Sequence, residues 1–593
     1  MLVAVAAAIA VATIGRAHIG ADFFDYLEWT KAFLTADVTQ ISSAVVSPEG
    51  YPLTQYHPGT GALFALPKLV APGIPLRVSA YLAAGAATLV LWTCITALVA
   101  RAAGGRADIV VLGIPLLFIA THAGYQSTAI ASELLSLALM AVVLVTLNLG
   151  SEDTTPFSIL LFGCAAGLLI GVRANLAPYV AAGALVYFRR ILRAPVTRAR
   201  KVYLALLVIV PVAAGCAEVL TVDHWMTGSW TGSPYVFGDA QFQSVDFSHP
   251  RFLTVLLHPR HGLLAYHPLY VVLIWATIAG LLSSASGSDA RLGWGAFLVA
   301  AAAALALQAC WYDWWMGRGT FGGRQLAVWA ILFMPPWIHR LAGAKPDSQG
   351  IKAWWLMSAV AALWSYPLLL GGITNFLSGQ EFLWGVWGAI RATFFETPWP
   401  LLALAAGACV LWLLHGREAR SRAGMVLVWS LIVVYLFHDN RLLAGAGDGK
   451  RLLAMGVLQV GTVGLLPLAL HQAERSQHAL GKLGARLRLG SQILTLCAFC
   501  VVAGLFVRLS LRAAPVPLAA REQCFGYRAP FDLLEVQATL LDYADLRGFE
   551  EDKRRLSAFV SRAGARYRIN PILPDSSRQA CLARHGIALR AWE

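Results

Sequence analysis

The sequence predicts an all-α polytopic membrane protein with roughly thirteen, and up to fifteen, transmembrane helices. Of its 593 residues, 58% are hydrophobic and 13% are charged, whereas soluble domains carry roughly 25% charged residues. Apolar runs of about 17–25 residues recur along the chain, and each is long enough to cross a ~30 Å hydrocarbon core as a helix. Helices are the expected spanning elements because they satisfy their own backbone hydrogen bonds.

The basic excess, a formal net charge of +14, is explained by topology, and nucleic acid is not an expected partner. Basic residues collect in alternate loops, which the positive-inside rule assigns to the cytoplasm; these loops are 101–106, 189–201, 340–352, 417–422 and 475–488. The intervening loops are poorer in Lys and Arg and are expected to face outward; they are 18–57, 223–260, 312–325 and 372–398. This pattern predicts a multi-pass protein of the bacterial cytoplasmic membrane, with a cytoplasmic N-terminus and an extracytoplasmic C-terminus.

Three regions are expected along the chain. Residues 1–336 are expected to form the first transmembrane module, 337–510 additional transmembrane helices, and 511–593 a small outward-facing domain, because charge rises and long apolar runs stop in the tail. Cys524 and Cys581 lie in this tail and can form a disulfide if it faces an oxidising compartment. Sequence alone does not establish the pairing.

Three apolar segments depart from the regular pattern. Residues 1–17 are interpreted as a short or truncated first transmembrane helix. Residues 59–70 are too few to span a bilayer and fit a re-entrant or surface-lying helix. The run 158–188 is interrupted at Arg173, so it forms either two short helices or one long irregular helix.

Carboxylates gather directly after the first apolar segment. Helical spacing would place Asp22, Asp25 and Tyr26 on one face, and Tyr26 and Trp29 are expected to act as interfacial anchors. An acid at a membrane surface can serve as a general base. An acid that caps a helix or faces water is about as well supported by the sequence.

Further candidates lie where apolar segments begin or break. Tyr56 and His57 precede a Pro-Gly helix entry, which favours a structural turn, with His57 a candidate contact to substrate or metal. Glu133 lies near the outer start of an apolar helix, where an ionisable side chain is either functional or held by a structural hydrogen bond. Arg173 can meet a phosphate or pair with Glu133.

Two later loops supply positive charge. The first reads LHPRHGLLAYHP and contains His258, Arg260 and His261. The second reads WYDWWMGRGTFGGR and contains Arg318 and Arg324. Arginine donors suit phosphate oxygens bidentately, while an aromatic belt with anchoring arginines is the structural alternative for the second loop.

The order of these motifs resembles that of the polytopic GT-C glycosyltransferases over roughly residues 1–336. These motifs are the acidic loop, the Tyr-Pro to His-Pro-Gly turn, the Ser-Glu helix start and the two basic loops. The resemblance is strongest to bacterial lipid-linked-sugar transferases related to the aminoarabinose and protein-mannosyl transferases. It implies a first-loop aspartate as catalytic base, which falls on Asp22 with Asp25 as its alternate, a polyprenyl-phosphate sugar donor, and inversion at the anomeric carbon.

The resulting hypothesis is transfer of one sugar to a cell-envelope glycan or glycolipid at the outer face of the membrane. Mg²⁺ or Mn²⁺ is an optional cofactor with Asp22, Asp25 and His57 as candidate ligands, although no residue spacing demands a metal. Two alternatives remain open. One is a transporter or flippase for lipid-linked glycans, and the other is a ligase or polymerase that uses a diphosphate-linked donor.

Overall fold

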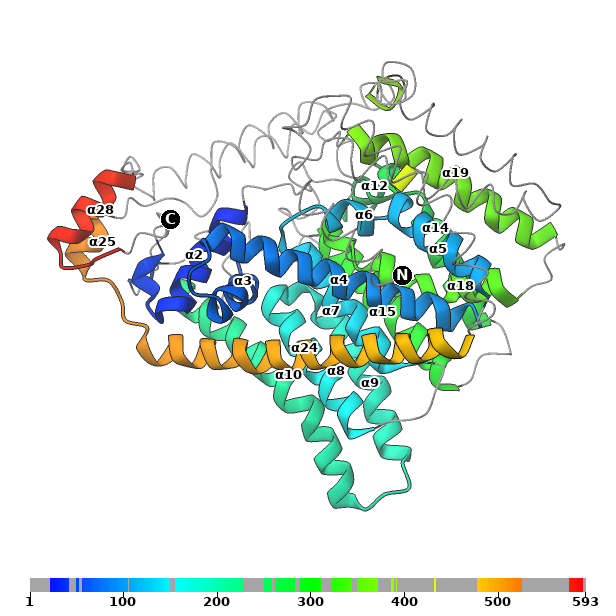
Figure 1. The fold of residues 1–593 in the computed structure, drawn as a ribbon, viewed down its shortest axis with the longest axis horizontal. Coiled ribbons are helices and arrows are strands. Elements are labelled where there is room, and N and C mark those ends of the chain that lie inside the picture. The colour runs from blue at the N-terminus through cyan, green and yellow to red at the C-terminus, as the bar shows by residue number, and fades with distance from the viewer. Residues whose placement is uncertain are drawn as a thin grey trace.

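The computed structural model describes much of the chain, and it does so as an assembly of helices (Figure 1). The described residues are 22–41, 50–52, 56–104, 106–149, 155–227, 230, 250–258, 262–282, 288–310, 323–343, 349–371, 385–388, 391, 431–432, 477–524 and 575–589. Within these ranges the regular elements are helical and there is no β-strand, as the composition predicts.

The helices follow one another with short connections. The first group is α2 (Asp22–Thr35), η1 (Val38–Gln40), α3 (Gly59–Val70), α4 (Leu76–Ala102), α5 (Ala107–Ala120), α6 (His122–Ser127) and α7 (Ser132–Leu147). The second is α8 (Pro156–Val172), η2 (Ala174–Leu176), α9 (Ala177–Arg193), α10 (Arg198–Thr227), α12 (Phe252–Leu257), α13 (Leu263–Tyr266), α14 (Leu269–Leu282) and α15 (Ser288–Cys310). The third is η4 (Arg324–Leu326), α17 (Trp329–Leu332), α18 (Met334–Gly343), α19 (Gln349–Gly371), α24 (Gln477–Arg512), α25 (Leu518–Cys524) and α28 (Asp575–Arg584).

Five described segments are long and apolar enough to cross a membrane. They are Leu76–Ala102, Arg198–Trp225, Asp289–Cys310, Arg324–Gly343 and Leu489–Arg512. Shorter apolar helices accompany them, including α3, α7, α8 and α14. The predicted spans at 399–414, 423–437 and 452–470 lie almost entirely outside the described residues, so the total of thirteen to fifteen stays a prediction.

Part of the predicted outer loop 18–57 is a helix. Residues 22–35 form α2 because large side chains recur at helical spacing on one face, and that face is buried: Phe23, Tyr26, Trp29, Thr30 and Phe33. The expectation that Tyr26 and Trp29 are interfacial anchors is therefore wrong. Their side chains are 2% and 0% exposed and fill the protein interior.

The short helix α3 packs closely against α2. The Thr30 hydroxyl donates to the Gly61 carbonyl at 3.0 Å, and a Cβ atom built on Gly61 would lie only 2.4 Å from the Cβ of Trp29. Glycine at this position thus permits the two helices to approach. On its other side, α3 accepts a hydrogen bond at the Phe64 carbonyl from Ser79 of α4, at 2.6 Å.

The interrupted run 158–188 forms two helices. The first, α8, ends at Val172 because Arg173 is in an extended conformation, with φ −152° and ψ 98°. A single 3₁₀ turn, η2, then leads into α9. The two-helix alternative is confirmed, and the break places Arg173 at a junction where its side chain is free to leave the helix surface.

Helices from the middle and later parts of the chain share one hydrophobic core with the first part. Leu368 of α19 and Leu505 of α24 belong to the same buried cluster as Phe64 and Leu139. Helix α24 lies across α3, α4 and α8, as the yellow-to-orange ribbon in Figure 1 shows. The expected boundaries at 336/337 and 510/511 remain predictions.

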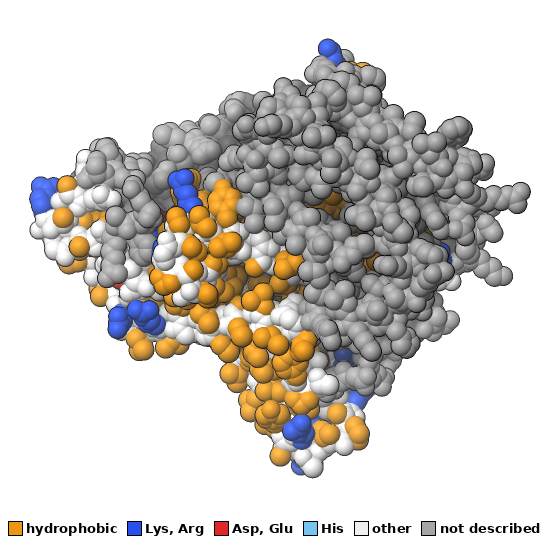
Figure 2. All heavy atoms as spheres, viewed as in Figure 1, with side chains coloured by type: hydrophobic (Ala, Val, Ile, Leu, Met, Phe, Trp, Pro, Cys, Tyr) orange, Lys and Arg blue, Asp and Glu red, His pale blue; other side chains and the backbone are white. Residues whose placement is uncertain are grey.

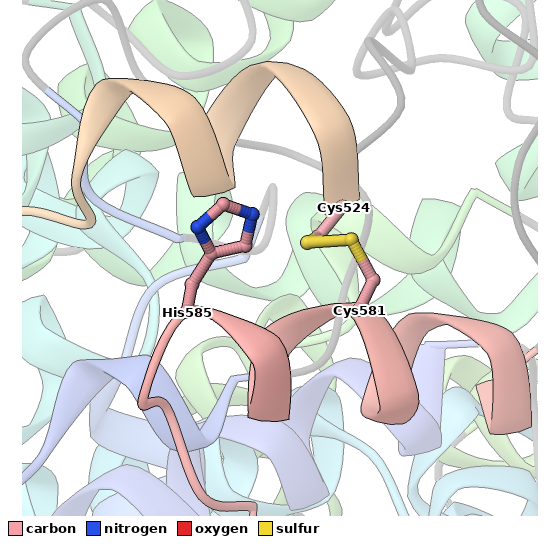
Figure 3. A group of neighbouring side chains, drawn as sticks. All are labelled: Cys524, Cys581 and His585. Carbon is pink, nitrogen blue, oxygen red and sulfur yellow. A yellow bond between two sulfur atoms is a disulfide. The ribbon is translucent and has the colours of Figure 1, made fainter.

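The C-terminal helices are tied to each other and to the first loop. Cys524 of α25 and Cys581 of α28 form a disulfide, drawn in Figure 3, so the pairing that the sequence left open is present. The Gln40 amide donates to the Ala588 carbonyl at 3.0 Å. The Val516 amide donates to the Gly50 carbonyl at 2.7 Å. The tail therefore docks on the segment that follows α2.

Replacing both Cys524 and Cys581 with serine should loosen the tail while the membrane helices stay intact. A cross-link stabilises mainly by restricting the unfolded chain, so we expect the local unfolding free energy of α25 and α28 to fall by about 2–4 kcal/mol. Hydrogen exchange measures this directly, with Cys497→Ser on α24 as a control. Unchanged protection of α25 and α28 would contradict the expectation.

Candidate functional site

Two arginines from distant segments converge on one buried carboxylate. The Nη1 atom of Arg173 lies 3.1 Å from Oε1 of Glu133, and the Nε atom of Arg324 lies 3.3 Å from the same oxygen. The Glu133 side chain is 2% exposed, while those of Arg173 and Arg324 are 14% and 24% exposed. Solvent can therefore reach the arginines more readily than the acid that holds them.

The position of Glu133 follows from the start of α7. It lies in the first turn of that helix, after Ala131, where the partial positive charge of a helix N-terminus favours an acid. A buried carboxylate is costly unless it is paired and hydrogen-bonded. Two guanidinium groups supply that pairing.

Side-chain amides complete the arginine arrangement. Arg173 donates through Nη2 to the Oε1 atom of Gln325 at 2.5 Å, and Asn175 donates through Nδ2 to the same oxygen at 3.3 Å. The break after α8 is thus held against η4 by both an ion pair and an amide. In this described network two guanidinium groups face one carboxylate, so one positive charge is in excess.

Helix α2 is hydrogen-bonded to the same centre. The Tyr26 hydroxyl donates to Oγ of Ser132 at 2.9 Å, and the Ser132 hydroxyl lies 3.4 Å from Oε2 of Glu133. Asp25 precedes Tyr26 on α2 and is half-buried. Asp22 begins the helix, and its side chain lies outside what the structure describes. The helix that carries both candidate bases therefore adjoins the Glu133 centre.

The Tyr56–Gly59 turn closes a second side of this centre. The indole of Trp29 donates to the Tyr56 carbonyl at 2.8 Å, and the rings of Tyr26 and Tyr56 lie 5.4 Å apart between centroids. A Cβ atom on Gly59 would fall 2.4 Å from the Gly171 carbonyl carbon, so the turn rests on the backbone at the end of α8.

His57 in this turn is held neutral at physiological pH. Burial, and then the positive charge of Arg173, lower the pKa of His57 from 6.5 to about 4. A neutral imidazole can donate one hydrogen bond and accept another. It adds no charge to the arginine pair.

A buried aromatic network supports the segment that carries Arg324. Gly323 precedes η4 with a left-handed φ of 70°, a conformation that glycine adopts readily. His122 and Tyr270 are hydrogen-bonded through Nδ1 and the hydroxyl at 2.8 Å. The Tyr270 hydroxyl in turn donates to the Ala327 carbonyl at 3.4 Å. These contacts fix the backbone directly after Gln325.

The structure brings together some of the predicted residues and leaves others aside. Glu133, Arg173 and Arg324 meet, Tyr56 and His57 adjoin them, and pairing of Arg173 with Glu133 was one of the two sequence alternatives. His258 lies at the end of α12, where its carbonyl accepts from the Gly262 amide at 2.6 Å. The remaining three predicted residues lie outside the described residues: Arg260, His261 and Arg318.

Sequence reasoning missed the two amide side chains. Gln325 and Asn175 each lie within two positions of an arginine that the sequence already marks. Adjacency of an amide to an arginine in a polar break between apolar helices is the one signal that could have indicated them.

The described residues offer one group of three potential metal ligands, and it lies elsewhere. Cys524, Cys581 and His585 have ligand atoms within 4.8 Å of one another, as Figure 3 shows. The two sulfurs are bonded to each other and provide no thiolate. A metal held by Asp22, Asp25 and His57 remains a prediction.

No family model matches the sequence, and no curated protein matches it significantly. Two crystal structures of ArnT from Cupriavidus metallidurans are similar to the fold. The one bound to undecaprenyl phosphate has a TM-score of 0.43 and 15% identity, covering 78% of this chain and 77% of that chain. The apo state has a TM-score of 0.44, 15% identity, and coverage of 78% and 76%. These neighbours come from the group that the sequence motifs resemble. At such identity and TM-scores the likeness transfers no residue role and no activity to this chain.

Replacing Glu133 with glutamine should destabilise the protein far more than the same change at Glu28. Removing one partner of a buried ion pair leaves uncompensated charge, which costs about 3–5 kcal/mol. Glu28 forms an ion pair with Lys31 within one helix at 2.6 Å, and such a pair contributes about 0.3–0.5 kcal/mol. Chemical unfolding in detergent compares the two variants. Equal losses would contradict the role assigned to Glu133.

His57 should make the protein less stable as the pH falls. Its folded pKa of about 4 lies below the ordinary 6.5, so in this window the unfolded chain binds more protons than the folded one. Stability is then lost from about pH 6.5 towards pH 4, with a slope of at most about 1.4 kcal/mol per pH unit. His57→Gln should remove this component. Unfolding free energies at about pH 5 and about pH 7.5 measure it, and an unchanged pH dependence in the variant would refute it.

Proposed function

We propose that the protein is a membrane glycosyltransferase that moves one sugar from a polyprenyl-phosphate carrier to a glycan or glycolipid acceptor at the outer membrane face. The observation that carries the proposal is the convergence of Arg173 and Arg324 on Glu133 beside the helix that bears Asp22 and Asp25. The order of the sequence motifs supports the same assignment. The fold contributes a set of apolar helices that suits a lipid-anchored substrate.

The arginine pair provides the phosphate side of the reaction. Guanidinium groups bind phosphate oxygens through paired, charge-assisted hydrogen bonds. Arg173 and Arg324 are more exposed than Glu133, so unused N–H groups can face a substrate. Glu133 acts as a positioning residue, since it fixes both guanidinium groups before the substrate arrives.

Proton abstraction falls to an aspartate of α2. As the acceptor oxygen attacks the anomeric carbon, its proton passes to the carboxylate. The bond between the anomeric carbon and the phosphate oxygen breaks, and the carrier phosphate leaves with one more negative charge. The arginines stabilise that charge. A single displacement inverts the anomeric configuration.

Two aspartates compete for the role of base. Asp25 is half-buried beside Tyr26, the residue that links α2 to Ser132. Asp22 lies about one helical turn earlier, and the family resemblance places the base there. The proposal keeps Asp22 as the base and Asp25 as its alternate or as a contact to substrate or metal.

Transfer assays on the purified protein in lipid test the base. Asp22→Asn or Asp25→Asn should lower the transfer rate by about 10²–10⁴-fold, the usual effect of losing a general base. Glu28→Gln on the same helix is the matched control and should leave the rate nearly unchanged. Full activity in both aspartate variants, with folding intact, would remove the base assignment.

Donor comparison tests the phosphate side. Arg173→Gln and Arg324→Gln should lower transfer from an undecaprenyl-phosphate-linked sugar by about 10²–10³-fold, while Arg77→Gln, on the surface of α4, should not. Transfer only from diphosphate-linked donors would assign a ligase or polymerase. Lipid translocation without sugar transfer would assign a transporter and overturn the proposal.

A further inference from the structure

The connection between α9 and α10 forms a projecting hairpin with basic side chains at its tip. Helix α9 ends at Arg193 and α10 begins at Arg198. In Figure 1 this pair of helices extends away from the rest of the molecule. Figure 2 shows hydrophobic side chains along the projection and basic ones near its end.

The acidic neighbour of this hairpin is already occupied. Asp289 of α15 accepts from Arg189 at 3.4 Å, from Arg190 at 3.5 Å and from Arg193 at 3.5 Å. Arg190 also donates to the Leu147 carbonyl at 2.6 Å and so caps the end of α7. One carboxylate thus serves three arginines, and most of their positive charge is not compensated by Asp289.

The tip itself carries further cations. Among the described residues Arg198 makes no ion pair, and the Arg200 guanidinium lies 5.1 Å from the centroid of the Tyr203 ring. The Lys201 ammonium donates to the Leu192 carbonyl at 2.5 Å and adds its charge to the same region. Arg193 has a side chain that is 60% exposed. These positive charges point to an anionic partner.

Exposed apolar side chains lie directly beside the cations. Leu192 is 70% exposed, Val202 59% and Tyr203 46%. The apolar exposure continues along α10, because residues 198–225 have a mean hydropathy of 2.2 in their most apolar window and 33% of that window is buried. This helix face has the composition of a surface in contact with lipid.

The length of α10 places its first turn at the lipid headgroups. A segment of 28 residues is about 42 Å long as a helix, whereas the hydrocarbon core is about 30 Å thick. Several ångströms must extend beyond the hydrocarbon at the ends. Arg198, Arg200 and Lys201 occupy one such end, at the level of phosphate groups.

We propose that the α9–α10 hairpin binds the headgroups of acidic phospholipids through Arg193, Arg198 and Arg200, with Leu192, Val202 and Tyr203 against the adjoining acyl chains. The site is separate from the Glu133 centre and does not depend on the proposed function. Uncompensated positive charge beside lipid-facing apolar surface suits a phosphatidylglycerol-like lipid, because both its charge and its chains are matched.

Lipid binding to the purified full-length protein in neutral detergent tests this proposal. Native mass spectrometry would compare phosphatidylglycerol with phosphatidylcholine for the wild type and for two triple variants. The hairpin variant carries Arg193→Gln, Arg198→Gln and Arg200→Gln. The control carries Arg77→Gln, Arg508→Gln and Arg512→Gln, three exposed arginines of α4 and α24, and loses the same charge.

We expect the wild type and the control to prefer phosphatidylglycerol and the hairpin variant to lose at least about tenfold in affinity for it. Each arginine near an anionic surface contributes about fivefold, so Arg198→Gln alone should show about that loss. It leaves every intramolecular ion pair of the described residues in place. Salt at about 1 M, where the Debye length is about 3 Å, should weaken binding.

Three results would overturn the proposal. One is equal wild-type affinity for the two lipids. Another is an equal loss in the hairpin and control variants, which would indicate net charge and not this surface. The third is abolition of phosphatidylglycerol binding by inorganic phosphate at the same concentration, which would assign the arginines to a free anion.

Discussion

The carboxylate of Glu133 is the interaction on which the arrangement of the site depends. It is buried at the start of α7, and it draws Arg173 from the break after α8 and Arg324 from η4. Without it, two positive charges would lie close together with nothing between them. Because one acid serves two guanidinium groups, the centre is stable when empty and yet retains attraction for an anion.

This centre is assembled from the ends of helices and from the turns between them. Arg173 follows the last residue of α8, Glu133 lies in the first turn of α7, and Gly323 introduces η4. Such positions release side chains from the helix surface while the apolar helices fix the backbone. In a protein whose core is almost wholly apolar, polar chemistry is concentrated where the regular hydrogen bonding stops.

Much of this was accessible from the sequence, because the relevant signals are local. Helical class, the interruption at Arg173 and the special status of Glu133 all follow from charge or polarity within an apolar run. The environment of α2 did not follow. Tyr26 and Trp29 have the composition of membrane-surface anchors, and only the presence of α3 and α7 beside them determines that they are buried. Likewise, docking of Ala588 on Gln40 joins opposite ends of the chain and leaves no local pattern to detect.

The backbone contact between Gly59 and Gly171 restricts where the site can open. With no side chain separating them, the turn that holds His57 and the chain end that leads to Arg173 behave as one rigid wall. A bulky lipid-linked molecule cannot enter by parting these two segments unless that close seam is broken. Admission must therefore take place along another boundary, where helices meet through flexible side chains that can swing aside.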